Sequence, residues 1–118
     1  MYSSNSDRVF EEDRAAFVVL YARGRPVGCG GLRSLGPELA EIKRMFVTPD
    51  ARLKGHGRLL LEELERRAAA NGATRVRLLT TEALTEALAL YESAGYAVVG
   101  SQEIAGRRDM WLERRLGH

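Results

Sequence analysis

The sequence predicts a single α+β domain in which an antiparallel β-meander is followed by a strand–helix–strand unit. Three observations predict it. The chain has 118 residues, the length of one domain. Short β-type segments separated by turn residues fill the first half, and leucines recur at helical spacing from residue 60 onward. With 45% hydrophobic and 29% charged residues, the composition excludes collagen-like, mucin-like and wholly disordered proteins.

The first half is expected to hold three strands, at residues 16–23, 27–32 and 39–47. Gly24, Arg25 and Pro26 form a turn cluster between the first two, which therefore make a hairpin. A second turn cluster at residues 34–37 precedes the third strand. Residues 1–14 are mostly polar or charged and show no sustained periodicity. We expect them to be a flexible or irregular segment, so the domain proper is residues 15–118.

In the second half of the chain, the spacing of apolar residues changes to that of a helix. A helix is expected over residues 57–70, because apolar residues lie at helical spacing at Leu60, Leu61, Leu64 and Ala68. A strand at 74–80 follows, and then a second helix, which Gly95 ends. Strands at 96–100 and 110–116 are expected to flank a polar loop. The total is about six strands and two main helices, and the first helix is long enough to connect parallel strands.

Charge and cysteine content exclude several classes of function. The chain carries 18 basic and 16 acidic residues, and the basic residues are scattered along the sequence. Aromatic residues make up only 7% of the chain. Because nucleic-acid-binding proteins usually cluster their basic residues, no nucleic acid is expected as a partner. No apolar run approaches the roughly 20 residues of a membrane span, and no leader opens the sequence, so we expect a cytoplasmic protein without a membrane partner. Cys29 is the single cysteine, which excludes an internal disulfide, and His56 and His118 give no metal-ligand spacing.

The third expected strand carries a break in its alternation. Apolar residues occupy positions 40 and 42, and then 45 and 47, so the phase slips between Ile42 and Met45. A β-bulge explains this slip and would make backbone groups available to a ligand. The alternative is that residues 45–47 are simply buried on both faces.

A glycine-containing turn opens the first helix. Gly55 and Gly57 allow a ligand to approach the backbone closely, and the first N–H groups of a helix favour anions. With Arg52, Lys54 and Arg58 nearby, this turn predicts a site for a diphosphate. The alternative is an ordinary turn whose arginines are solvated.

The sequence excludes two common kinds of nucleotide-binding site at this turn. A Walker loop requires glycine, four residues and then Gly-Lys-Ser or Gly-Lys-Thr, and the sequence contains no such string. A dinucleotide-binding loop requires a third glycine where Leu60 stands. Neither the usual ATP or GTP site nor an NAD site is therefore expected.

Two motifs follow one another along the chain. The first is Arg52-x-x-Gly55-x-Gly57, after a strand that ends at Val47, and the second is Tyr91-Glu-Ser-Ala-Gly-Tyr, which comes a helix later. In this order they resemble the motifs of the GNAT superfamily of N-acetyltransferases. The resemblance covers roughly residues 17–116. It implies a mixed, twisted sheet that splays open between its fourth and fifth strands at the cofactor site. It also implies acetyl-CoA as co-substrate, without a metal. The residues implied to hold acetyl-CoA are Met45, Phe46 and Val47 for the pantetheine arm and Arg52, Leu53, Lys54, Gly55, His56, Gly57 and Arg58 for the diphosphate.

The resemblance also implies two catalytic residues. Glu41 matches the position of a general base, and the alternative is that it only pairs with Lys43 or with an arginine of a neighbouring strand. Tyr91 matches the tyrosine that protonates the departing sulfur, and the alternative is a core tyrosine. Cys29 is expected to be a small buried hydrophobe and His56 an exposed loop residue. The implied reaction is direct transfer of an acetyl group, in a ternary complex, to a primary amine of a small molecule or peptide.

The sequence departs from the family before its first hairpin, where only about fifteen residues stand and family members usually have several tens. The acceptor pocket is therefore expected to be open, completed by another subunit, or absent. This leaves two alternatives to an enzyme that works alone. One is a catalytically weak coenzyme A-binding module or partner subunit. The other is a homodimer in which each chain lends its N-terminal segment to its partner.

Overall fold

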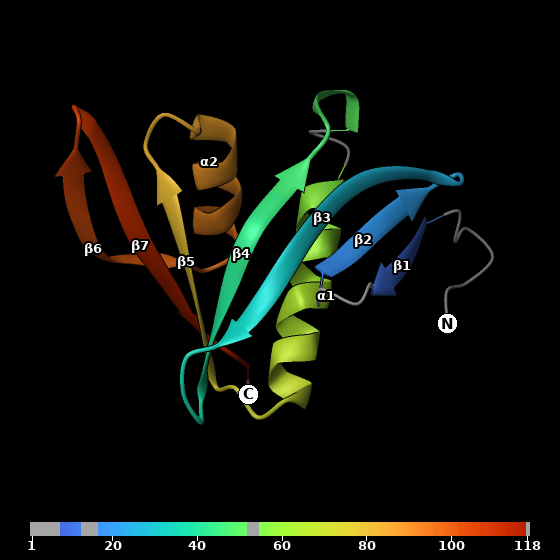
Figure 1. The fold of residues 1–118 in the computed structure, drawn as a ribbon, viewed down its shortest axis with the longest axis horizontal. Coiled ribbons are helices and arrows are strands. Elements are labelled where there is room, and N and C mark those ends of the chain that lie inside the picture. Colours follow the sequence, from blue (N-terminus) through green and yellow to red (C-terminus); the bar gives the residue numbers. More distant parts are fainter. Residues whose placement is uncertain (1–7, 13–16, 52–54, 118) are drawn as a thin grey trace.

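The computed structural model describes residues 8–12, 17–51 and 55–117, and the strands in these ranges form one sheet of seven strands in the order β1-β2-β3-β4-β5-β7-β6 (Figure 1). The elements along the chain are β1 (Arg8–Glu12), β2 (Phe17–Ala22), β3 (Arg25–Ser34), β4 (Leu39–Val47), the 3-10 helix η1 (Pro49–Ala51), α1 (His56–Ala70), β5 (Arg75–Thr81), α2 (Thr85–Ser93), β6 (Ala97–Ile104) and β7 (Arg107–Arg115). Neighbouring strands are antiparallel except β4 and β5, which are parallel because α1 connects them. The α+β fold with two main helices is confirmed.

The sheet differs from the expectation at both ends. Within the segment 1–14, expected to be irregular, residues 8–12 form β1, which pairs with β2 along its whole length and adds a seventh strand. The polar loop expected after residue 100 is wrong, because β6 and β7 continue through it to a tight turn at Ala105 and Gly106. Both segments receive their hydrogen bonds from a neighbouring strand, which local periodicity does not reveal.

Both helices lie on the same face of the sheet. The connections from β4 to β5 and from β5 to β6 run in the same direction across it, and right-handed crossovers then place α1 and α2 on one side. Leucines of α1 pack closely on β3, where glycines make room: a Cβ at Gly30 would lie 2.8 Å from Leu64 Cδ1. The start of α1 touches α2 in the same way, since a Cβ at Gly57 would lie 3.0 Å from Leu90 Cδ2.

A buried polar trio joins α1 to the carboxyl-terminal part of the sheet. The Tyr96 hydroxyl donates a hydrogen bond to Glu65 Oε2 (2.8 Å), and Arg114 Nη1 donates to Glu65 Oε1 (2.7 Å). Burial, and next the charge and hydrogen bond of Glu65, raise the pKa of Tyr96. The Tyr91 ring lies beside this trio, its centroid 6.0 Å from that of Tyr96. The trio therefore supports the part of α2 that carries Tyr91.

The other face of the sheet carries charged side chains in place of a helix, as far as the described residues go. On this face Arg77 and Arg75 both donate to Glu113, at 2.5 Å and 3.1 Å from their nearest nitrogens. The Arg77 guanidinium also lies over the Trp111 ring, 5.7 Å from its centroid. Ion pairs across neighbouring strands thus cover a surface that would otherwise expose an aromatic ring.

Candidate active site

The sheet splays open between β4 and β5. These strands pair only over Leu39–Ile42 and Arg75–Leu78, and then diverge toward the ends of both strands (Figure 1). A cavity of about 270 Å³ lies where they separate. Its lining residues come from β4, β5, α2 and β7: Ile42, Arg44, Met45, Leu78, Leu79, Thr80, Thr81, Leu84, Ala87, Tyr91, Arg107 and Asp109. The expected opening between the fourth and fifth strands is confirmed.

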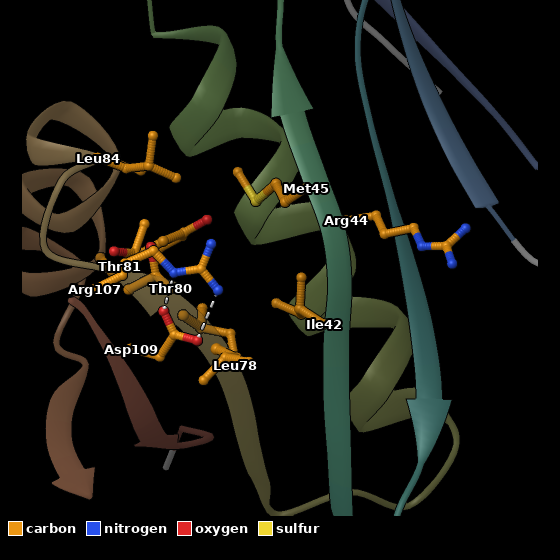
Figure 2. A pocket seen from close by; sticks show the side chains of 12 residues that line it. Ile42, Arg44, Met45, Leu78, Thr80, Thr81, Leu84, Arg107 and Asp109 are labelled. Carbon is orange, nitrogen blue, oxygen red and sulfur yellow. Dashed lines mark hydrogen bonds and ion pairs between the residues drawn. The ribbon is translucent and has the colours of Figure 1, made fainter. Parts of the chain in front are cut away.

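A β-bulge lies on β4 at the mouth of this opening. On β3 the single residue Gly30 faces two β4 residues, Arg44 and Met45, and Arg44 takes a φ of 55°. The bulge predicted between Ile42 and Met45 is confirmed. The alternative of burial on both faces is wrong, because Phe46 is 49% exposed. The bulge sends the Arg44 side chain away from the other labelled residues of the cavity (Figure 2).

The predicted diphosphate turn is described only in part. Arg52, Leu53 and Lys54 lie outside the described residues. Gly55 precedes α1 in a left-handed conformation (φ 84°), and no side chain of the described residues makes a capping hydrogen bond to the start of the helix. The first turn of α1, residues 56–58, thus has its N–H groups at the positive end of the helix dipole, as a diphosphate site requires.

Three other residues of the prediction are placed as follows. The Arg58 guanidinium donates to Ser93 Oγ (2.5 Å), so this side chain connects α1 to the end of α2. His56 is partly buried as the first residue of α1, whereas we expected an exposed loop residue. Cys29 is partly buried on β3.

Tyr91 lies on α2, where it lines the cavity and is 6% exposed. Burial raises the pKa of its hydroxyl, so the phenol keeps its proton at neutral pH. Tyr91 is therefore a core residue, as the alternative interpretation held, that also lines the cavity, and its role as a proton donor stays a prediction.

Glu41 is placed differently from Tyr91. It is 7% exposed, but its Oε1 accepts hydrogen bonds from Arg33 Nε (3.0 Å) and Nη2 (2.6 Å) on the neighbouring strand β3. Successive side chains of a strand point to opposite faces, so Glu41 lies on the face opposite to Ile42, which lines the cavity. The alternative interpretation, an ion pair with a neighbouring-strand arginine, is what the structure shows. A catalytic role for Glu41 stays a prediction.

Sequence reasoning missed Arg107 and Asp109, which lay in the expected polar loop. Asp109 is 6% exposed, and Arg107 donates to both of its carboxylate oxygens, at 2.8 Å from Nε and 3.1 Å from Nη2 (Figure 2). One signal in the sequence was Ala105-Gly106, a pair with φ of 53° and 78° that closes a two-residue hairpin. This turn places both charged residues near the start of β7, beside the splayed end of β5.

In the described ranges, no group of three or more histidine, cysteine or acidic residues could hold a metal ion. In the same ranges no helix is both long enough and apolar enough to cross a bilayer.

Comparison with known proteins gives several matches. The profile of the acetyltransferase (GNAT) family matches residues 1–96. A protein from Azospirillum brasilense named IAA acetyltransferase is 40% identical over 83 residues, which cover 69% of this chain and 54% of that protein. The chain spans about half the length of several curated relatives that it matches.

Solved structures match the fold. Ard1 from Thermoplasma volcanium superimposes with a TM-score of 0.79 at 19% identity, over 87% of this chain and 72% of that one. A GNAT family acetyltransferase from Elizabethkingia anophelis, solved with acetyl-CoA bound, gives a TM-score of 0.73 at 19% identity, over 85% and 75% of the two chains. The profile match, the sequence identity and the splayed sheet agree, and the chain belongs to the GNAT acetyltransferase family.

Proposed function

We propose that this protein transfers the acetyl group of acetyl-CoA to a primary amine of a small molecule or peptide, by direct transfer in a ternary complex. The observation that carries the proposal is the cavity at the separation of β4 and β5, with a bulge on one side and Tyr91 on another. The relative solved with acetyl-CoA has the same fold, which supports the choice of co-substrate.

The described residues fit an extended ligand that ends in a diphosphate. Met45, Phe46 and Val47 lie where β4 has diverged from β5, so an arm containing amides can lie along them as an added strand does. The first turn of α1, from Gly55 to Arg58, offers N–H groups and a helix dipole to the diphosphate. Arg52, Leu53 and Lys54, which were predicted for the same site, lie outside the described residues.

When bound, the thioester supplies an acetyl carbon to which the amine nitrogen bonds while the carbon–sulfur bond breaks. The Tyr91 hydroxyl, which stays protonated because of its burial, donates its proton to the departing sulfur. The backbone N–H of Met45 at the bulge donates to the carbonyl oxygen as negative charge develops there.

Binding and turnover test the proposal separately. Acetyl-CoA at 100 times its Kd should stabilise the protein by about 2.7 kcal/mol, which a thermal shift detects, while NAD and ATP should not. Thiol release with a panel of primary amines then measures transfer. No thermal shift at millimolar acetyl-CoA, together with no thiol release, would contradict the proposal.

A second candidate is a coenzyme A-binding module or partner subunit without a complete acceptor site. It is favoured by the sheet face that carries charged side chains in place of a helix in the described part of the chain. This candidate predicts a thermal shift with acetyl-CoA but no amine-dependent thiol release. A homodimer would scatter light as twice the chain mass of 13.1 kDa, and a monomer mass would exclude it.

A further inference from the structure

The cavity contains a carboxylate that the family resemblance did not lead us to expect. Asp109 lines it together with Tyr91, and it is the one acidic residue among the described residues of the lining. At 6% exposure it is as well buried as the tyrosine. A carboxylate in such a site is held there by a partner, here Arg107. Asp109 is therefore placed to meet a cationic group that enters the cavity.

The polar residues of the cavity lining other than Arg44 lie on β5, α2 and β7. Ile42 and Met45 lie on the β4 side, and Asp109 with Thr80 and Thr81 lies across from them (Figure 2). Asp109 pairs in register with Thr81 at the end of β5, the part of β5 beyond its pairing with β4. An amine in this cavity finds its hydrogen-bond acceptors on the β5 and β7 side.

Arg107 can leave this carboxylate when another cation takes its place. Its side chain is 61% exposed, whereas that of Asp109 is 8% exposed, so the guanidinium can move into water while the carboxylate remains. A buried carboxylate without a partner is costly, so the exchange requires that the arriving cation replace the guanidinium. Glu41 is the rival carboxylate; it is held by Arg33, and it is not among the described residues that line the cavity.

We propose that Asp109 binds the ammonium group of the acceptor, in exchange for Arg107, and takes a proton that the acceptor nitrogen loses. The proposal rests on the proposed acetyl transfer. The ammonium first loses one proton to an oxygen of Asp109, and the electron pair left on the nitrogen bonds to the acetyl carbon. The nitrogen then loses a second proton, which replaces the one that Tyr91 gave to the departing sulfur, and Asp109 later gives its proton to water.

The test compares Asp109→Asn with the wild type. The control is Glu103→Gln, which removes the same charge from an exposed position of the same hairpin. Spermidine and benzylamine are the probes, and three quantities are measured. These are the thermal shift with acetyl-CoA, the amine-induced changes in backbone NMR shifts without acetyl-CoA, and kcat/KM for each amine as a function of pH.

Asp109→Asn should keep the acetyl-CoA shift, lose the amine-induced NMR changes, and lower kcat/KM by about 100-fold, the size expected for a lost general base. Arg107→Gln should lower the KM for the amine about two- to fivefold, because an exposed ion pair no longer competes. Glu103→Gln should match the wild type in all three measurements.

Amine binding and turnover in Asp109→Asn equal to those of the wild type would overturn the inference, most directly if Glu41→Gln then showed the loss. A loss of amine binding in Arg107→Gln would overturn the exchange. If the wild type bound no acetyl-CoA or released no thiol with either amine, the proposed function would fail, and the role of Asp109 with it. If the wild type is active but Asp109→Asn binds and acetylates the amines as the wild type does, the proposed function is retained and only the role of Asp109 is rejected.

Discussion

The hydrogen bond from Tyr96 to Glu65 gives a direct measure of what holds α1 against the carboxyl-terminal strands. Tyr96 is 4% and Glu65 8% exposed, so water cannot replace the hydroxyl in Tyr96→Phe. A hydrogen bond to a charged group contributes about 1.5–3 kcal/mol. Arg114 still neutralises Glu65 in the variant, so we expect a loss near the lower end, about 2 kcal/mol.

The same residue predicts how this loss depends on pH. The folded pKa of Tyr96 is raised, so its contribution is fully present below the unfolded pKa of about 10 and is lost as pH rises above it. At pH 11 an unfolded tyrosine gains about 1.4 kcal/mol from ionisation that a protonated folded one does not. Phenylalanine does not ionise. The difference in the free energy of unfolding between the wild type and Tyr96→Phe should therefore shrink from about 2 kcal/mol at neutral pH to about 0.6 kcal/mol at pH 11.

Urea denaturation followed by circular dichroism at pH 7.5 and pH 11 measures both quantities. Tyr21→Phe, a partly buried tyrosine on β2, is the matched control for loss of a hydroxyl. Equal stability of Tyr96→Phe and wild type at pH 7.5 would refute the reasoning about the trio. A difference that stays constant between the two pH values would refute the linkage to Tyr96 ionisation.

Two further predictions concern the candidate site. Tyr91→Phe should lower kcat about 100-fold at unchanged acetyl-CoA affinity, measured by steady-state kinetics and thermal shift, and full activity would remove Tyr91 from the mechanism. Gly57→Val should abolish acetyl-CoA binding by filling the diphosphate site, but it also presses on Leu90 and should cost about 1–3 kcal/mol. The double variant with Leu90→Ala relieves that pressure, and if it binds acetyl-CoA as tightly as Leu90→Ala alone, the diphosphate is placed wrongly.

Much of the fold could be predicted from local pattern. The helix expected at 57–70 is α1, and the strand expected at 39–47 is β4 with the same bounds. The bulge was visible as a phase slip, because a strand that must keep one face buried shows an inserted residue in its alternation. The strands of the β6–β7 hairpin were predicted in part, but their continuation through residues 101–109 was not visible in this way, since β6 is exposed almost throughout and has no buried face to impose a pattern.

The two predicted catalytic residues, Tyr91 and Glu41, show which features of the site can be predicted from sequence and which cannot. The sequence motif around Tyr91 includes the helix that carries this residue and the residues that end that helix. The position of Tyr91 beside the cavity could therefore be predicted from sequence. Glu41 differs by one position from Ile42, and that one position decides which face a side chain occupies. The partner that claims Glu41, Arg33, is set by the register between β3 and β4.

By itself the sequence determined the order of the elements, the bulge and the turn before α1, because spacing and turn residues among near neighbours specify these features. Only the tertiary structure decided that residues 8–12 join the sheet, that Arg33 pairs with Glu41, and that Asp109 lines the cavity. The physical reason is that strand pairing joins residues far apart in the chain. Its register, which no local stretch encodes, selects the side chains that meet at the opening between β4 and β5.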